Sequence, residues 1–225
     1  MFDSRYQAVL ADTAEGRFIH YRLRYQVYCL EKRFEPAERF ADRLERDEFD
    51  RHSVHFLIQH KPSGNWVATA RLVLGEPHQL PIAKIAKFSL PEYTLEGKRF
   101  AELSRLSILK SFRYLGKQHE QVDEPEVLLG LIRAAKEYSE RANLDYWLFL
   151  CRRSIMRIVG NLGMHMEVIG DPCEHRGVRF PYLAELATAF DGIATRIPAV
   201  YAMFSRTNTL VPYSLIQQNS NRKAA

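Results

Sequence analysis

The sequence predicts a mixed α/β fold in which helices cover both faces of a β-sheet. Segments with the composition of strands recur along the chain, and segments with helical periodicity stand between them. Hydrophobic residues make up 46% of the chain, which is enough for a substantial core. A length of 225 residues suits one domain. We therefore expect a single domain over residues 1–225, with a frayed tail from about residue 219.

The first predicted element is a helix over residues 12–33. Asp12, followed by Glu15 three residues later, resembles a capping box, and we expect Asp12 to cap this helix. Two neighbouring apolar stripes at helical spacing indicate deep burial. The stripes are formed by Phe18, Tyr21, Tyr25 and Tyr28 and by Ile19, Leu23 and Leu30. Arg24 lies between them, so we expect it inside the fold rather than on a solvated face.

The remaining elements follow a charged segment, residues 34–53, which predicts a long loop with one helical turn. Residues 54–60 and 66–74 read as a hairpin, because a Pro-Ser-Gly-Asn stretch lies between them. Residues 100–109 read as a buried strand, and residues 123–143 as a helix capped by its first aspartate. The other predicted elements are strands at 145–151, 164–170 and 178–186 and a helix at 152–163.

Charge and hydropathy exclude several classes of protein. The net charge of +5 suits an acidic partner, but the basic residues are dispersed and carry no nucleic-acid-binding motif. We therefore expect no nucleic-acid partner. No apolar run approaches the roughly 20 residues of a membrane span. The acidic N-terminus lacks a signal-peptide pattern, and we expect a cytoplasmic protein.

Cysteine spacing indicates neither a metal site nor a disulfide framework. Cys29, Cys151 and Cys173 are far apart and odd in number. We expect reduced thiols and no metal. Cys151 follows a predicted strand, but the sequence signals no histidine partner for a catalytic role.

The predicted strand FAELSRLSIL, residues 100–109, contains polar residues within an otherwise apolar pattern. Alternation places Glu102 and Ser104 on one face and Arg105 on the other, unless a bulge re-aims Arg105. One interpretation is a set of buried ion pairs that only fixes register. The other is a carboxylate held in a cleft, ready to accept a proton from an amine. These residues alone do not decide between the two.

Further charges stand upstream at elements directed toward the core. Arg24 lies in the first predicted helix, Asp47 and Asp50 in the charged loop, and Arg71 interrupts the strand WVATARLVL. Opposite charges on such elements could converge into one network with the polar residues of the strand at 100–109. Any one of them alone would be read as an ordinary surface charge.

Five motifs in order resemble the signature of acyl-homoserine lactone synthases. They are Arg24-Tyr-Gln-Val-Tyr28, Phe34, Glu45-x-Asp47-x-x-Asp50, Arg71-Leu72 and Glu102-x-Ser104-Arg105. The strings LRYQVYCLEKRFEP and ELSRLSILKSFR are closer to a sister group, the exosortase-associated acyltransferases, which is similar to the N-acyl amino acid synthases. Lactone synthases usually have phenylalanine where this chain has Tyr28 and tryptophan where it has Phe34. These departures favour an amino acid or another amine over S-adenosylmethionine.

The resemblance implies a GNAT-like fold, with a sheet splayed between the strands at 100–109 and 145–151 and a thioester arm inserted there. It implies an acyltransferase that binds no cofactor tightly and uses an acyl carrier protein or acyl-CoA thioester as co-substrate. Glu102 would be the base, with Arg105 and Ser104 beside it. Ser104 lacks a neighbouring histidine and is not expected to be a nucleophile. The residues expected to hold the acceptor amine are Arg24, Tyr28, Phe34, Asp47, Asp50 and Arg71.

The thioester arm and its fatty chain also have candidate residues. KSFRYLGK offers basic side chains and turn N–H groups to a phosphate, although a plain solvated turn has the same composition. The expected carrier-side residues are Leu106, Ile108, Lys110, Arg113 and Lys117. Trp147 and Phe149 could line an acyl pocket, although such residues are more often plain core.

The expected function is therefore transfer of a fatty acyl group from an acyl carrier protein thioester to the amine of an amino acid or similar small amine. The first alternative is an acyl-homoserine lactone synthase that uses S-adenosylmethionine. The second is a non-catalytic module that binds acyl carrier protein or a membrane. The expected partners are an acidic acyl carrier protein and a small amine, and a peripheral membrane contact stays open.

Overall fold

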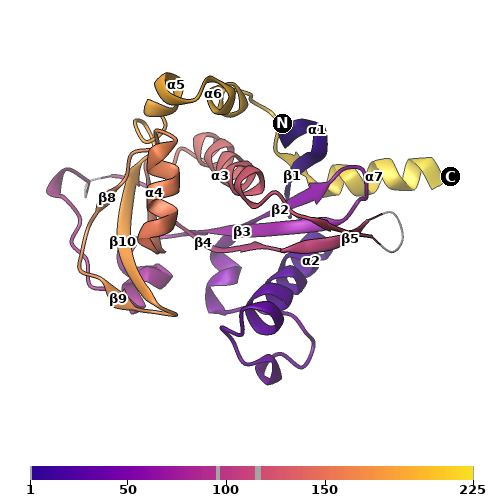
Figure 1. Ribbon diagram of the computed structural model, residues 1–225. Coiled ribbons are helices and arrows are strands. Elements are labelled where there is room, and N and C mark those ends of the chain that lie inside the picture. The colour runs from indigo at the N-terminus through magenta and orange to yellow at the C-terminus, as the bar shows by residue number, and fades with distance from the viewer. Residues whose placement is uncertain (1, 95–96, 115–117, 225) are drawn as a thin grey trace. The chain divides into compact units, whose positions relative to one another are not determined.

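The computed structural model describes residues 2–94, 97–114 and 118–224 (Figure 1). The chain divides into two compact units. Unit 1 comprises Met1–Arg71, Arg105–Tyr138 and Asn208–Ala225, and unit 2 comprises Leu72–Ser104 and Ser139–Thr207. Strands β3 (Trp66–Leu74) and β4 (Phe100–Ile108) contribute residues to both units.

The strands of unit 1 lie in the order β11-β1-β2-β3. β1 (Tyr6–Leu10) pairs antiparallel with β2 (Ser53–His60) and parallel with the short β11 (Val211–Pro212). The turn from β2 to β3 is closed by the N–H of His60, which donates to the carbonyl of Asn65 at 2.8 Å. The predicted hairpin is confirmed.

Helices cover both faces of these strands (Figure 1). On one face, Leu23 of α2 (Ala14–Arg24) packs with Val9 of β1 and Leu57 of β2 in a buried apolar cluster. On the other face, the ring of Phe56 contacts Tyr138 of α3 (Glu124–Arg141) edge to face at 6.0 Å. The alternation of side chains along β2 therefore separates two helix-covered layers.

Several shorter elements complete unit 1. They are α1 (Phe2–Arg5), the π-helix η1 (Tyr25–Glu31), the 3₁₀ turns η2 (Ala37–Arg39) and η3 (Glu48–His52), β5 (Ser111–Tyr114), β6 (Gln118–Gln121) and α7 (Tyr213–Ala224). The antiparallel pair of β5 and β6 was not predicted from the sequence. α7 extends past the point where we expected a frayed tail.

Unit 2 is built on the strand order β4-β7-β10-β8. β7 (Tyr146–Cys151) pairs antiparallel with β10 (Val178–Glu185), and its ladder with β4 is parallel. That parallel ladder joins only Phe100–Glu102 to Tyr146–Leu148, although both strands continue beyond it. The ladder between the two central strands thus ends at Glu102, as expected for a splayed sheet.

The smaller elements of unit 2 connect these strands. They are η4 (Pro77–Gln79), η5 (Pro81–Lys84), η6 (Glu92–Thr94), α4 (Arg153–Asn161), β8 (Glu167–Val168), β9 (Cys173–Glu174), α5 (Gly192–Arg196) and α6 (Pro198–Phe204). The predicted strand at 164–170 is reduced to the two residues of β8. Parallel and antiparallel pairs together make a mixed α/β fold, as predicted.

Two predictions about the first helix are wrong. Thr13, not Asp12, is the N-cap of α2, and its hydroxyl accepts from the N–H of Gly16 at 3.1 Å. The carboxylate of Asp12 instead accepts from the N–H of Ser214 at 3.0 Å, near the start of α7. Moreover, Phe18 and Leu30 are 46% and 48% exposed. The buried face of α2 carries His20 and Arg24 beside Leu23, so polar residues form much of a face that was expected to be mainly apolar.

Candidate active site

Arg24 is the last residue of α2 and is fully buried, as predicted. Its Nε atom donates to Glu45, and its Nη1 atom donates to Asp50 Oδ1 at 2.6 Å. Its Nη2 atom lies 3.8 Å from Asp47 Oδ2. A buried guanidinium requires such partners, because an unpaired charge in the interior is costly.

The two aspartates are oriented by the local fold of the charged loop. Asp47 is the N-cap of η3, and its side chain accepts from the N–H of Phe49 at 3.0 Å. In return, Asp50 Oδ2 accepts from the N–H of Asp47 at 2.7 Å, which completes a capping box. This reciprocal cap fixes both carboxylates next to each other.

Arg71 of β3 binds both aspartates. Its Nη1 and Nη2 atoms donate to Asp47 Oδ1 at 2.6 Å and to Asp47 Oδ2 at 2.9 Å. Nη1 also donates to Asp50 Oδ1 at 2.6 Å. Two parallel bonds between a guanidinium and a carboxylate are geometrically specific, so Arg71 fixes the orientation of Asp47.

Arg105 of β4 joins the same network through an unusual backbone conformation. Its φ angle is +51°, in the left-handed region that costs a residue with a Cβ about 1–2 kcal/mol. Its Nη2 atom donates to Asp47 Oδ2 at 3.0 Å, and its Nε atom lies 3.3 Å from Glu45 Oε1. The guanidinium carbon lies 5.4 Å from the centre of the Tyr28 ring, a cation–π distance. Strict alternation would have directed Arg105 elsewhere.

Tyr28 and Phe34, both half-buried, make contact at the margin of this network. Their rings meet edge to face at a centroid distance of 5.9 Å. Tyr28 thereby connects Phe34 to the guanidinium of Arg105. The structure brings both predicted aromatic residues together with the charged ones.

The network balances three guanidinium groups against three carboxylates. We call it the ion network; its members are Arg24, Arg71, Arg105, Glu45, Asp47 and Asp50. Burial alone would raise the pKa of Asp47, but the hydrogen bonds and charge of Arg71, with the other arginines, lower it to about 2. The pKa of Asp50 is likewise lowered by Arg24 and Arg71 against the effect of burial. Both aspartates are thus suited to bind cations rather than to act as bases near neutral pH.

The ion network has one edge toward solvent. The side chains of Asp47 and Arg105 are each 18% exposed, whereas those of Arg24, Arg71, Glu45 and Asp50 are nearly or fully buried. The exposed edge therefore offers one carboxylate and one guanidinium to a ligand. Glu45 belongs to the motif Glu45-x-Asp47-x-x-Asp50 but was not among the expected site residues; its exposure of 1% could not be read from its charged surroundings in the sequence.

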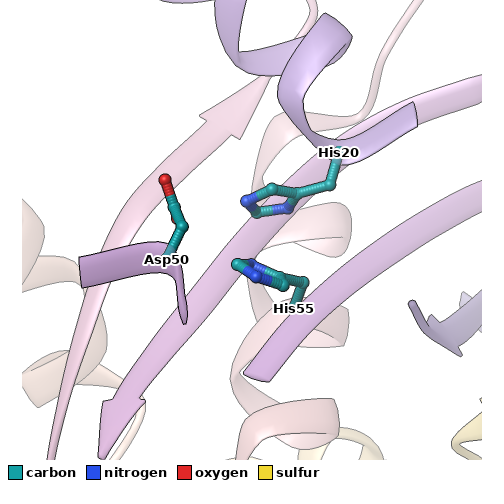
Figure 2. A group of neighbouring side chains, drawn as sticks. All are labelled: His20, Asp50 and His55. Atoms are coloured by element: carbon teal, nitrogen blue, oxygen red, sulfur yellow. The ribbon is translucent and has the colours of Figure 1, made fainter. Parts of the chain in front are cut away.

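His20, Asp50 and His55 form a group whose ligand atoms lie within 4.8 Å of one another (Figure 2). In the part of the chain that the structure describes, it is the one such group that could hold a metal ion. The donor set does not fit a cation, because Asp50 Oδ1 already binds two guanidinium groups at 2.6 Å. A divalent ion there would face strong repulsion from both arginines. We therefore assign the two histidines to the surroundings of the ion network.

Glu102 and Ser104 lie in unit 2. Glu102 is 4% exposed, and its Oε2 atom accepts from the N–H of Ile82 at 2.6 Å. It occupies the last pair of the β4–β7 ladder, opposite Leu148. A base role would therefore require that the amine be delivered to it inside the fold. That role, and any role of the half-buried Ser104, stays a prediction.

The predicted carrier-side residues are spread along β4 and the hairpin after it. Leu106 and Ile108 are half-buried, and Lys110 is exposed. Arg113 lies in β5, paired with His119 of β6, and Lys117 lies outside the described residues. Their predicted contact with a phosphopantetheine arm is an open expectation.

The predicted acyl-pocket residues have the surroundings of a core. Trp147 is fully buried, and its Nε1 atom donates to the hydroxyl of Ser139 at 2.9 Å. Its ring meets those of Phe149 and Phe190 edge to face, both at 5.9 Å. Packing in the core is sufficient to account for Trp147 and Phe149 at these positions. Their role in an acyl pocket stays a prediction.

The cysteines are poor candidates for nucleophiles. Burial raises the pKa of Cys151 to about 12 and that of Cys29 to about 11, and it also raises the pKa of Cys173. Since the thiolate is the reactive form, these thiols are inert near neutral pH.

Comparisons with known proteins agree with this geometry. Residues 23–117 match the family described as "Acetyltransferase (GNAT) domain", and this stretch carries every member of the ion network as well as Glu102. The match agrees with the predicted GNAT-like fold. No curated protein sequence matches the chain significantly.

Solved structures with the same fold include lactone synthases and an N-acyl amino acid synthase. TofI, in a ternary complex with an inhibitor and MTA, is 18% identical, with a TM-score of 0.61 over 86% of this chain and 99% of its own. FeeM, an N-acyl amino acid synthase from uncultured soil microbes, is 14% identical, with a TM-score of 0.57 over 85% and 97%. BjaI, a CoA-dependent acyl-homoserine lactone synthase solved with SAM and isopentyl-CoA, is 14% identical, with a TM-score of 0.58 over 92% of each chain. At these identities the similarity establishes the fold.

Proposed function

We propose that this chain is an N-acyltransferase that moves a fatty acyl group from an acyl carrier protein thioester to the amine of an amino acid or a similar small amine. The GNAT domain and the synthases among its structural neighbours support an acyltransferase that acts on an amine. The observation that carries the proposal is the ion network, because a set of six paired charges with a single exposed edge is suited to bind a small charged acceptor.

The exposed edge matches the charge pattern of an α-amino acid. Asp47 can bind an ammonium group and Arg105 a carboxylate, while each keeps a second partner inside the network. Tyr28 and Phe34 add apolar surface beside them. A zwitterionic acceptor would thus replace the bond between Asp47 and Arg105 with two bonds of its own.

The chemistry needs no covalent enzyme intermediate. An ammonium must first lose a proton, and we propose that Glu102 accepts it, directly or through a water molecule. The free amine then attacks the thioester carbonyl, the C–S bond breaks, and the proton passes to the departing thiolate. Backbone N–H groups of β4 beyond the end of its ladder with β7 would stabilise the oxyanion.

The donor is proposed to be an acyl carrier protein. The net charge of +5 suits an acidic carrier and would mainly speed association, an effect that fades with salt. Because BjaI is a CoA-dependent synthase, acyl-CoA should be tested as a donor beside the acyl carrier protein thioester. The described residues contain no helix with the length and apolar character of a membrane span. We also propose a cytoplasmic setting, and the resemblance of LRYQVYCLEKRFEP and ELSRLSILKSFR to exosortase-associated acyltransferases supports a link with exosortase protein sorting.

The second candidate function is synthesis of an acyl-homoserine lactone from S-adenosylmethionine. The neighbours solved with SAM or MTA favour it, because such ligands occupy the same fold. Tyr28 and Phe34 weigh against it, since the resembling lactone synthases usually have phenylalanine and tryptophan there. Both candidates share the donor and the network and differ in the acceptor.

The deciding experiment gives purified protein an acyl carrier protein thioester or acyl-CoA, together with single amino acids or S-adenosylmethionine. We expect mass spectrometry to find an N-acyl amino acid and no methylthioadenosine. Release of methylthioadenosine with an acyl lactone would establish the second candidate. Carrier binding without turnover on any acceptor would instead indicate a non-catalytic module.

A further inference from the structure

A short hydrogen-bonded chain leads from the middle of β3 to Arg24. The hydroxyl of Thr69 donates to the carbonyl of Phe56 at 2.6 Å, and the same oxygen is bonded to His20 Nδ1. His20 Nε2 lies 3.4 Å from Arg24 Nη1, one helical turn away. Thr69 and His20 are both fully buried.

The groups at the two ends of this series of hydrogen bonds determine which atom donates in each bond. A guanidinium only donates, so His20 Nε2 must accept from Arg24. The single hydrogen of the Thr69 hydroxyl is used by Phe56, so Thr69 can only accept from His20. His20 is therefore the neutral tautomer that carries its proton on Nδ1.

The surroundings of His20 keep it neutral. Burial, helped by the neighbouring His55 and the charges of Arg24 and Arg71, holds the pKa of His20 well below its usual value. The His55 ring lies 4.3 Å away and the Tyr21 ring 5.4 Å away, centre to centre. Asp50 also lies close to both imidazoles (Figure 2).

His20 completes the bonding of one nitrogen of Arg24. The two hydrogens of Nη1 go to Asp50 and His20, and Nε is taken by Glu45. The plane of the guanidinium is thereby fixed, which aims Nη2 at Asp47. Among the described residues Nη2 has no hydrogen-bond partner, although it is buried. Nη2 thus directs its positive charge at Asp47, the carboxylate of the exposed edge.

We propose that His20 and Thr69 are positioning residues that hold Arg24 so that Nη2 faces the acceptor-binding edge at Asp47. The effect on acceptor binding rests on the proposed function, whereas the hydrogen bonds and the tautomer of His20 do not. Neither residue touches the expected substrate; both act through Arg24. No signal in the sequence indicated either one.

The first test compares Thr69→Val with Thr69→Ser. Valine keeps the shape but leaves the Nδ1 proton of His20 without its acceptor, whereas serine keeps the hydroxyl. We expect the valine variant to raise the KM for the acceptor amine about tenfold, the equivalent of one buried hydrogen bond, with the KM for the thioester unchanged. Serine should restore the wild-type value. Equal loss of active enzyme in both variants, with unchanged KM values, would refute the positioning role.

The second test needs no turnover. Nitrogen-15 NMR of the histidine-labelled wild-type protein, assigned with His20→Gln, should show Nδ1 protonated and Nε2 unprotonated from neutral pH down through the ordinary histidine pKa. A protonated Nε2, or titration near the ordinary value, would overturn the inference whatever the enzyme assay shows. If no acceptor is acylated but the tautomer is as expected, the proposed function fails while the assignment of His20 stands.

Discussion

The two units bury carboxylates in different ways. In unit 1, Asp47 and Asp50 are ionised within a network of opposite charges, so each depends on several partners. In unit 2, the buried Glu102 accepts a hydrogen bond from the backbone N–H of Ile82. The carboxylates of the ion network are committed to their ion pairs, whereas the role of Glu102 as a base stays a prediction. The proposed roles, acceptor binding for the ion network and proton transfer for Glu102, can therefore be tested separately.

The sharpest test of this division is Glu102→Gln. The amide keeps an acceptor for Ile82 N–H and nearly the same shape, so folding should persist. Loss of a general base should lower kcat about 10²- to 10⁴-fold. Glu137→Gln is the matched control, because the carboxylate of Glu137 is also buried and accepts from Thr209 N–H at 3.0 Å. Unchanged turnover in the Glu102 variant, measured on folded protein, would end the base hypothesis.

Breaking the ion network should affect stability more than any neutral change. Arg71→Met removes the arginine that donates hydrogen bonds to both Asp47 and Asp50, and we expect a loss of about 3–5 kcal/mol in the free energy of unfolding. Urea denaturation measures it. The comparison variant is Arg133→Met, which removes a buried arginine that pairs with Asp3. If Arg71→Met lowers the free energy of unfolding no more than Arg133→Met does, the members of the ion network do not stabilise one another beyond an ordinary buried ion pair.

Coupling can be measured directly by adding Asp47→Asn to Arg71→Met. If the two groups act as one unit, the double variant should lose clearly less than the sum of the single losses. Strict additivity would show that Asp47 is held by Arg24 and Arg105 without Arg71.

Acid should destabilise unit 1 through its histidines before its aspartates. Burial lowers the pKa of His55 to about 4, so between its ordinary value near 6.5 and pH 4 the unfolded chain binds a proton that the folded chain does not. Stability is therefore full above pH 6.5 and falls as the pH drops, by about 3 kcal/mol for this residue. Asp47, with a pKa of about 2, loses its contribution only below its usual pKa near 4.

His55→Leu isolates this effect. Both ring nitrogens of His55 lack a hydrogen-bond partner among the described residues, so leucine removes unsatisfied polar atoms from the interior. We expect a flatter dependence of unfolding free energy on pH between about 6.5 and 4, and no loss of stability at neutral pH. A profile as steep as that of the wild type would assign the acid sensitivity to another group.

Most members of the ion network were predicted from the sequence, but the backbone geometry that brings them together was not. Spacing and resemblance identified Arg24, Asp47, Asp50 and Arg71, because charged residues on core-directed elements must find partners. The direction of the Arg105 side chain could not be predicted, since it depends on a positive φ angle and strand alternation assumes regular extended backbone. The match to the GNAT family and the β4–β7 ladder confirm the predicted fold class.

The missed features share a physical cause. His20 stands on the buried face of α2 beside Arg24, but hydrophobic periodicity counts it as polar and therefore outside. The hairpin of β5 and β6 and the cap at Thr13 depend on local hydrogen bonds that compete closely with alternatives. Tertiary contacts decide which of the competing local hydrogen bonds form, and these contacts cannot be read from a single sequence.

The smallest expected effect belongs to the exposed edge of the network. Arg105→Lys keeps the positive charge but cannot bond Asp47 and Glu45 with a planar fork. Because the Arg105 side chain is partly exposed and lysine keeps the charge, the loss of stability should be below about 1 kcal/mol. If this edge binds the carboxylate of the acceptor, the KM for amino acids should rise several-fold, while a simple amine without a carboxylate should be unaffected. An equal rise for both acceptors would move the carboxylate-binding role away from Arg105 and leave it an element of the network's internal charge balance.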